Sequence, residues 1–151
     1  DLIKRMIGVF STLPARFLIN VGGFLDAYDR VPDNVYLGSW FPQPSVVPLA
    51  ALFIHHGGNN SYCEALYHGV PSLVMPYCWD GHDNATRVQE TGHGLHMHRA
   101  NWTEEQLHAA VDRLLTDRDM AAKLAATSAH MQSRHGPTKA AGLRDKLAKD
   151  A

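Results

Sequence analysis

The chain has 151 residues, of which 45% are hydrophobic and 19% are charged, and its formal net charge at pH 7 is −1. This length suffices for one domain whose core needs neither disulfides nor a metal. The near-neutral charge argues against a nucleic-acid-binding protein, which would carry a basic patch. The apolar runs have strand length and fall short of the roughly 20 residues of a membrane helix, so we expect a soluble protein without a membrane partner.

Short β-rich runs alternate with helix-length segments up to about residue 98. An amphipathic helix before Pro14 precedes the first strand, and later helices end at glycines suited to the left-handed position after a helix. This alternation predicts an α/β fold with a doubly wound, mainly parallel, Rossmann-like sheet and flanking helices. The expected strands are 16–21, 35–37, 52–54, 73–75 and 95–97, and the expected helices between the later strands are about 61–68 and 83–90.

The pattern becomes purely helical after His98. Thr103 and Gln106 have the spacing of a capping box, in which each side chain bonds the other's backbone at a helix start. Gly136 and Pro137 interrupt the last stretch. The chain has no internal repeat or low-complexity linker, so we expect one domain over residues 1–151.

The most informative segment is the loop after the third predicted strand, LFIHHGGNNSYCEALYHGVP. Ligands of doubly wound sheets bind beyond the carboxyl ends of the strands, which is where this loop lies. Gly57 and Gly58 allow close approach of backbone N–H groups, and a helix that starts near Ser61 offers unpaired donors to an anion. His56 could add a hydrogen bond or a positive charge. These residues predict a phosphate site.

A purely structural interpretation competes with the phosphate site. Ser61-x-x-Glu64 is itself a capping-box spacing, which would close the helix end without any ligand. Neither the G-x-G-x-x-G fingerprint nor a P-loop lysine is present, which weakens dinucleotide and P-loop interpretations.

Three blocks carry the most specific pattern. Residues 34–43 read NVYLGSWFPQ, residues 55–71 read HHGGNNSYCEALYHGVP, and residues 73–85 read LVMPYCWDGHDNA. In order and spacing they resemble the nucleotide-sugar signature of family 1 glycosyltransferases with the GT-B fold. The resemblance is densest over about residues 34–95 and extends over the whole chain. It implies the C-terminal, donor-binding half of a two-domain enzyme that uses a UDP-sugar or dTDP-sugar.

The resemblance implies a role for each matching residue on the nucleoside side. Trp40 would stack on the base, the Phe41 backbone and Gln43 would hold the base or ribose, and Glu64 would accept hydrogen bonds from the ribose. The chemistry agrees, because an indole offers a broad face to a base and such stacking contributes about 1–3 kcal/mol. A tryptophan buried in the core is the competing interpretation of Trp40.

The diphosphate and sugar contacts implied by the resemblance follow the second and third blocks. The diphosphate would contact His56, the backbone of Gly57 and Gly58, Asn60 and Ser61.

Asp80 falls where the family places an acid that binds sugar hydroxyls, but the usual following Gln is replaced by Gly81. His82 could supply the lost hydrogen bond, or it could simply face solvent. The sequence around Trp79 and Asp80 is similar to glycosyltransferases that attach deoxysugars to natural products.

Ten histidines invite a metal interpretation, above all at His93, His96 and His98. No acidic or cysteine ligand completes a site, and catalytic zinc usually takes three protein ligands, so we expect no metal and no cofactor. His55 is interpreted as the last residue of a strand. Cys63 and Cys78 fit neither a zinc pattern nor a disulfide framework, and no motif marks Cys63 as a nucleophile, which favours a reducing, cytoplasmic location.

The resulting hypothesis is the donor-binding domain of an inverting, metal-independent glycosyltransferase that acts on a hydroxyl of a small-molecule acceptor. In the family the acceptor base lies in the N-terminal domain, so we expect no catalytic base in this chain and no transfer by it alone. The chain begins at Asp1 with the helix that follows the family's first strand, so we expect a clipped fragment. The alternatives are a non-catalytic nucleotide-sugar-binding subunit that needs a partner chain, and a GT-B sugar-nucleotide epimerase.

Overall fold

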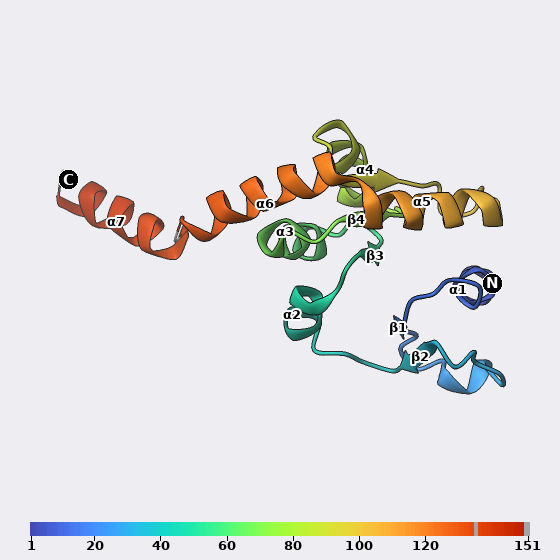
Figure 1. Ribbon diagram of the computed structural model, residues 1–151. Coiled ribbons are helices and arrows are strands. Elements are labelled where there is room, and N and C mark those ends of the chain that lie inside the picture. The colour runs from blue at the N-terminus through green and yellow to red at the C-terminus, as the bar shows by residue number, and fades with distance from the viewer. Residues whose placement is uncertain (135, 150–151) are drawn as a thin grey trace.

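The first part of the chain forms one helix and a pair of parallel strands. The computed structural model describes residues 1–134 and 136–149 (Figure 1). The Asp1 side chain accepts a hydrogen bond from the Ile3 N–H at 3.0 Å and so caps the first helix. The elements are α1 (Leu2–Phe10), β1 (Phe17–Asn20) and β2 (Val35–Gly38), and β1 pairs with β2 in parallel.

The central part forms a second parallel sheet with the order β3-β4-β5. Strand and helix alternate as expected, which confirms the α/β class. The strands belong to two sheets, because no hydrogen-bonded ladder joins β1 or β2 to the other three strands within the described residues. The elements are α2 (Gln43–Val46), β3 (Phe53–His55), α3 (Asn59–His68), β4 (Ser72–Val74), α4 (Asp80–Glu90) and β5 (Gly94–His96), with short 3-10 helices at Leu25–Ala27 and Val47–Leu49.

Two helix starts differ from the expectation. α3 begins at Asn59, two residues before Ser61, and α4 begins at Asp80 rather than near 83. Gly58 precedes α3 and has no side chain that could cap it. Trp79 precedes α4, and its side chain makes no capping hydrogen bond. The ends were placed better: Gly69 has the left-handed conformation that closes α3.

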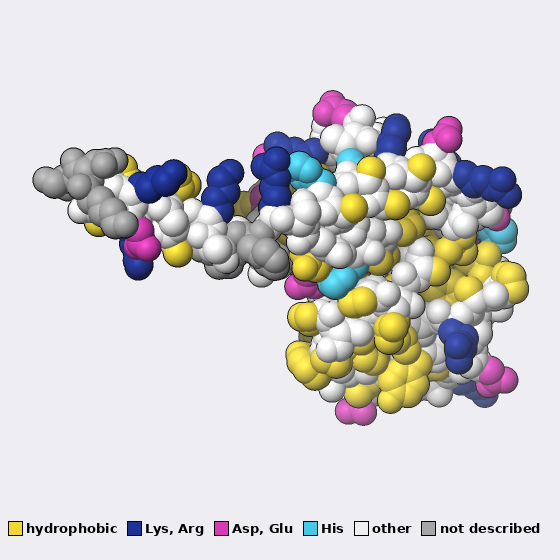
Figure 2. Space-filling model, turned by 60° about the vertical axis from the view of Figure 1, so that its left-hand side comes forward, with side chains coloured by type: hydrophobic (Ala, Val, Ile, Leu, Met, Phe, Trp, Pro, Cys, Tyr) yellow, Lys and Arg dark blue, Asp and Glu magenta, His cyan; other side chains and the backbone are white. Residues whose placement is uncertain are grey.

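Three helices complete the chain: α5 (Glu104–Thr116), α6 (Arg118–Gln132) and α7 (Gly136–Lys149). The predicted capping box is present, with Thr103 Oγ1 accepting from the Gln106 N–H at 3.2 Å and Gln106 Oε1 accepting from the Thr103 N–H at 2.9 Å. α7 extends away from the rest of the molecule (Figures 1 and 2). No helix of the described residues is long and apolar enough to cross a membrane.

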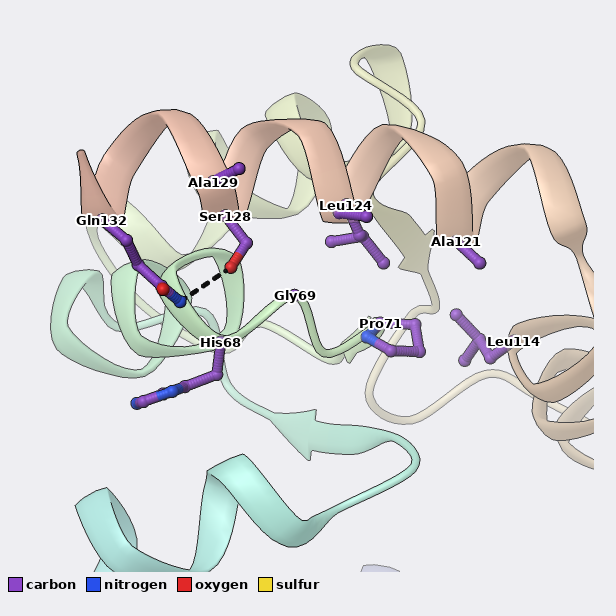
Figure 3. Close-up of a pocket in the computed structure, with 10 residues that line it drawn as sticks. His68, Gly69, Pro71, Leu114, Ala121, Leu124, Ser128, Ala129 and Gln132 are labelled. Carbon is purple, nitrogen blue, oxygen red and sulfur yellow. Dashed lines mark hydrogen bonds between the residues drawn. The ribbon is translucent and has the colours of Figure 1, made fainter.

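One hydrophobic core joins the two sheets. It includes buried side chains of α1, β2, β4, α5 and α6, such as Ile7, Val35, Leu73 and Leu107. α6 also covers the C-terminal end of α3 (Figure 3). There, Ser128 Oγ donates to the Tyr67 carbonyl at 2.6 Å. This core holds β3, β4 and α3 together, and a second cluster of Tyr62, Val74, Ala85 and Val88 packs α4 against α3 and β4.

Candidate functional site

The loop between β3 and α3 is held from both sides. Gly57 has a φ of +87°, which an L side chain rarely adopts. Its N–H donates to His55 Nδ1 at 3.0 Å, and its carbonyl accepts from the buried Asn84 Nδ2 at 2.8 Å. The Gly57 N–H is therefore already engaged, and this residue shapes the loop.

His55 is the last residue of β3, as expected, and it is only 9% exposed. Burial, with a smaller contribution from the charge of His56, lowers the pKa of His55 to about 4. The ring is thus neutral at pH 7. Because Nδ1 accepts a hydrogen bond, the proton is on Nε2, which is buried and has no hydrogen-bond partner among the described residues.

His56 lies over the start of α3. A Cβ built at Gly58 would come within 2.6 Å of His56 Nε2, so the imidazole edge covers the backbone of the residue that precedes the helix. The His56 ring also lies beside the ring of Tyr77, and the two ring centroids are 5.6 Å apart. His56 is exposed and can present a hydrogen bond to a ligand at the helix end.

The N-terminus of α3 retains free donors. The Asn59 N–H is occupied by Asp80 Oδ2 at 3.1 Å, whereas the N–H groups of Asn60 and Ser61 make no hydrogen bond within the part of the chain that the structure describes. These groups and the positive end of the helix dipole favour an anion. Together with His56 these N–H groups form a patch of donors, the predicted diphosphate patch.

The capping-box interpretation of Ser61 and Glu64 is wrong. Both residues lie inside α3, and both accept hydrogen bonds from Gln43 Nε2, at 3.2 Å to Ser61 Oγ and at 2.8 Å to Glu64 Oε2. The helix begins two residues earlier, which moves Ser61 out of the capping position. Gln43, at the start of α2, is therefore brought to Glu64, predicted to hold the ribose, and to Ser61, predicted to contact the diphosphate.

Trp40 lies in the loop between β2 and α2, and its side chain is 71% exposed. The alternative of a core tryptophan is therefore wrong. Phe41, in contrast, is half-buried, and its ring packs against Gly38 and edge-on to Tyr36 with ring centroids 6.1 Å apart. Phe41 thus anchors the loop that presents the free indole.

Gly81 brings α4 against the loop. It is buried, and a Cβ built on it would lie 2.6 Å from the His56 carbonyl oxygen. Close backbone packing thus gives a reason for glycine here. His82, the next residue, is exposed. Burial of His96, together with the nearby charges of His82 and His98, lowers the pKa of His96.

The remaining histidines are engaged locally. His93 Nδ1 and Nε2 each lie 2.7 Å from a threonine hydroxyl, those of Thr91 and Thr127. His98 Nδ1 accepts from two backbone N–H groups. Among the described residues no group of three His, Cys, Asp or Glu side chains is placed to hold a metal ion; that the protein needs no metal stays a prediction.

Neither of two cavities in the described part of the chain encloses the candidate site as a whole. A cavity of about 400 Å³ lies instead between α6 and the end of α3, lined in part by His68 and Ser128 (Figure 3). A second, of about 480 Å³, includes His82 but no other predicted site residue.

Three contacts that hold the site in place were not predicted from the sequence. His55 and Asn84 hold Gly57, and Asp80 binds the first N–H of α3. Asn84 stands in the third motif block, but its contact lies 27 residues away along the chain. Only its place on the buried face of α4 could have indicated a structural role.

The chain matches a family model and several known proteins. The family model described as "Erythromycin biosynthesis protein CIII-like, C-terminal domain" matches residues 18–147. The chain is 35% identical over 134 residues to aklavinone 7-beta-L-rhodosaminyltransferase of Streptomyces galilaeus, covering 85% of this chain and 30% of that protein. It is 30% identical over 147 residues to 3-alpha-mycarosylerythronolide B desosaminyl transferase of Saccharopolyspora erythraea, covering 97% and 35%.

A solved structure, that of the glycotransferase of kitacinnamycin, superposes with a TM-score of 0.89 at 30% identity and covers 96% of this chain and 38% of that one. The chain spans about a third of the length of the curated relatives it matches. On the family model, the relatives and the fold, this chain belongs to the erythromycin biosynthesis protein CIII-like C-terminal domains, within the family 1 glycosyltransferases of GT-B fold.

Proposed function

We propose that this chain binds the nucleotide-sugar donor of an enzyme that transfers a sugar from UDP or dTDP to a hydroxyl of a small-molecule acceptor, with inversion. Both curated relatives are named as sugar transferases. Their names support the reaction class, and the site described above supports the part of it that falls to this chain.

The observation that carries the proposal is the convergence of three separate motif blocks. Gln43 of the first block hydrogen-bonds Glu64 of the second, and Asp80 of the third hydrogen-bonds Asn59 of the second. Side chains that are separated by 18 to 21 positions in the sequence from the groups they bind thus meet them at the start of α3. A donor molecule needs this arrangement, because its base, ribose, diphosphate and sugar must be held at once.

The nucleoside would be held between the β2–α2 loop and α3. Trp40 would stack on the base, with the Phe41 backbone beside it. Glu64 would accept from the ribose hydroxyls, and Gln43 would keep that carboxylate in place through its 2.8 Å hydrogen bond.

The diphosphate and the sugar would follow along the N-terminus of α3. The diphosphate would accept hydrogen bonds from the His56 side chain and from the free N–H groups of Gly58, Asn60 and Ser61. Gly57 would shape the loop. Asp80 and His82 would face the sugar hydroxyls, with Gly81 setting their position.

The chemistry assigned to this chain is stabilisation of the leaving group. Negative charge grows on the diphosphate as the bond to the sugar breaks, and donors fixed at a helix end meet it without reorganisation. The proposal therefore requires no metal. Deprotonation of the acceptor hydroxyl requires a base within hydrogen-bond reach. We place that base in an acceptor-binding domain outside this chain, so the 151-residue chain should bind donor but not transfer sugar.

Calorimetric titration with UDP and with dTDP tests the proposal. Trp40→Ala should weaken binding about 5- to 150-fold, which corresponds to the loss of one base-stacking contact. His56→Ala should weaken it about tenfold, through loss of a hydrogen bond to a charged group. Matched controls are Tyr67→Ala, at the opposite end of α3, and His108→Ala, on the exposed face of α5. Binding that both site variants leave intact would remove the site.

A further inference from the structure

We propose that Trp79 is a binding platform for the hexose of the nucleotide-sugar donor, held in a strained backbone conformation for that purpose. The inference rests on the proposed donor-binding function and adds to it a residue that contacts the sugar. Three observations lead to it: the backbone of Trp79, the exposure of its side chain, and its place beside Asp80.

The backbone of Trp79 is strained. Its φ is +42° and its ψ is −131°, and it is the single non-glycine residue of the described chain with a positive φ. A β-carbon crowds the neighbouring backbone in this region, so a bulky residue there is a true outlier. Glycine would adopt the same conformation without strain. Strained residues of this kind gather at functional sites.

The side chain of Trp79 does not stabilise the fold and so does not offset this backbone strain. The indole is 88% exposed, so it buries little apolar area, and it takes part in none of the aromatic or cation-π pairs of the described residues. A large aromatic residue that neither packs nor relaxes its backbone is explained by a ligand that covers it.

The turn that carries Trp79 is fixed next to the diphosphate patch. The Gly81 N–H donates to the Cys78 carbonyl at 3.1 Å, and the His82 N–H donates to the Trp79 carbonyl at 3.3 Å. Gly81 packs on the His56 carbonyl. Asp80, the next residue, binds the first N–H of α3. Trp79 is therefore attached to the corner of the site where the group bonded to the distal phosphate would lie.

That group is the hexose, whose chemistry suits this pair of residues. One face of a pyranose ring carries mainly C–H bonds and packs on an aromatic plane, whereas its hydroxyls seek a carboxylate. Trp79 offers the plane and Asp80 the carboxylate. Gly81 contributes no side chain, so the indole is the large contact surface on this turn, and a deoxyhexose with its additional apolar positions would cover it well.

The test compares each donor with its sugar-free nucleotide. We would measure Kd for dTDP-glucose and dTDP, and for UDP-glucose and UDP, in the wild-type chain and in Trp79→Phe, Trp79→Ala and Trp79→Gly. Trp79→Ala and Trp79→Gly should weaken sugar-nucleotide binding about five- to tenfold, and should leave the Kd of dTDP and UDP within twofold of wild type. Trp79→Phe, which keeps an aromatic plane, should stay near wild type.

Thermal melting separates strain from contact. Trp79→Ala and Trp79→Gly both remove the ring, but only Trp79→Gly relaxes the positive φ, so Trp79→Gly should melt about 2–4 °C above Trp79→Ala. Equal melting temperatures would overturn the strain argument. A Trp79→Ala chain that keeps the wild-type ratio of sugar-nucleotide to nucleotide affinity, or that weakens both ligands equally, would overturn the platform. Failure of the wild-type chain to bind any nucleotide would instead refute the proposed function.

Discussion

Lowering the pH from 7 to 5 should destabilise this protein by about 2 kcal/mol through one buried side chain, His55. In the folded protein burial lowers the pKa of His55 to about 4, against an ordinary value of 6.5. Its imidazole is held neutral, with Nδ1 accepting the Gly57 N–H at 3.0 Å and Nε2 buried without a partner. Folding therefore competes with protonation of this ring.

The sign and size follow from the two pKa values. Well above pH 6.5 the ring is neutral in both states, and His55 causes no loss of stability. Between pH 6.5 and 4 the unfolded chain binds a proton that the folded chain does not, so stability falls as the pH falls. The loss reaches about 2 kcal/mol at pH 5 and levels off at about 3 kcal/mol below pH 4, at 1.36 kcal/mol for each pH unit between the two values.

Urea unfolding at pH 7.5 and pH 5 measures this effect, with His55→Asn as the matched variant. An asparagine amide oxygen can accept the Gly57 N–H but does not titrate. The wild-type protein should lose about 2 kcal/mol more than His55→Asn between the two pH values. His93 and His96, whose pKa values are also lowered by burial, are present in both proteins and cancel. Equal losses in the two proteins would refute the assignment of a neutral, buried His55.

Two further substitutions test the packing that supports the site. Gly81→Ala should lower the free energy of unfolding by about 1–3 kcal/mol, because the new methyl group would meet the His56 carbonyl oxygen at 2.6 Å. Gly8→Ala, in α1 with no atom within 4 Å of the new methyl group, is its control and should instead stabilise the protein by up to about 1 kcal/mol; if both variants unfold alike, the close contact at residue 81 is wrong. Asn34→Ala should cost about 1–3 kcal/mol in urea unfolding, since Asn34 Nδ2 donates to the carbonyls of Phe10, Leu13 and Ala15 at 2.8–3.1 Å. Unchanged stability of that variant would mean that solvent satisfies these carbonyls equally well.

The sequence alone determined the strands, their order and the helices between the later strands. Hydrophobic spacing located all five strands within one or two residues, and the capping box at Thr103 formed as predicted. Such signals are local: a capping box or a strand is specified by residues within a few positions of each other. The three motif blocks likewise identified the family, because their residues and spacing are properties of the chain itself.

Only the tertiary structure decided what each site residue contacts. Ser61 and Glu64 had a local partner in the capping interpretation, yet both bind Gln43, which packing brings from 18 and 21 residues away. Packing also left Trp40 exposed and made His55 a neutral group that holds the Gly57 loop. Such contacts, burial and pKa values depend on how strands and helices pack on one another. The sequence therefore predicted the candidate binding residues, and packing decided which of them are exposed to a ligand and which hold the others in place.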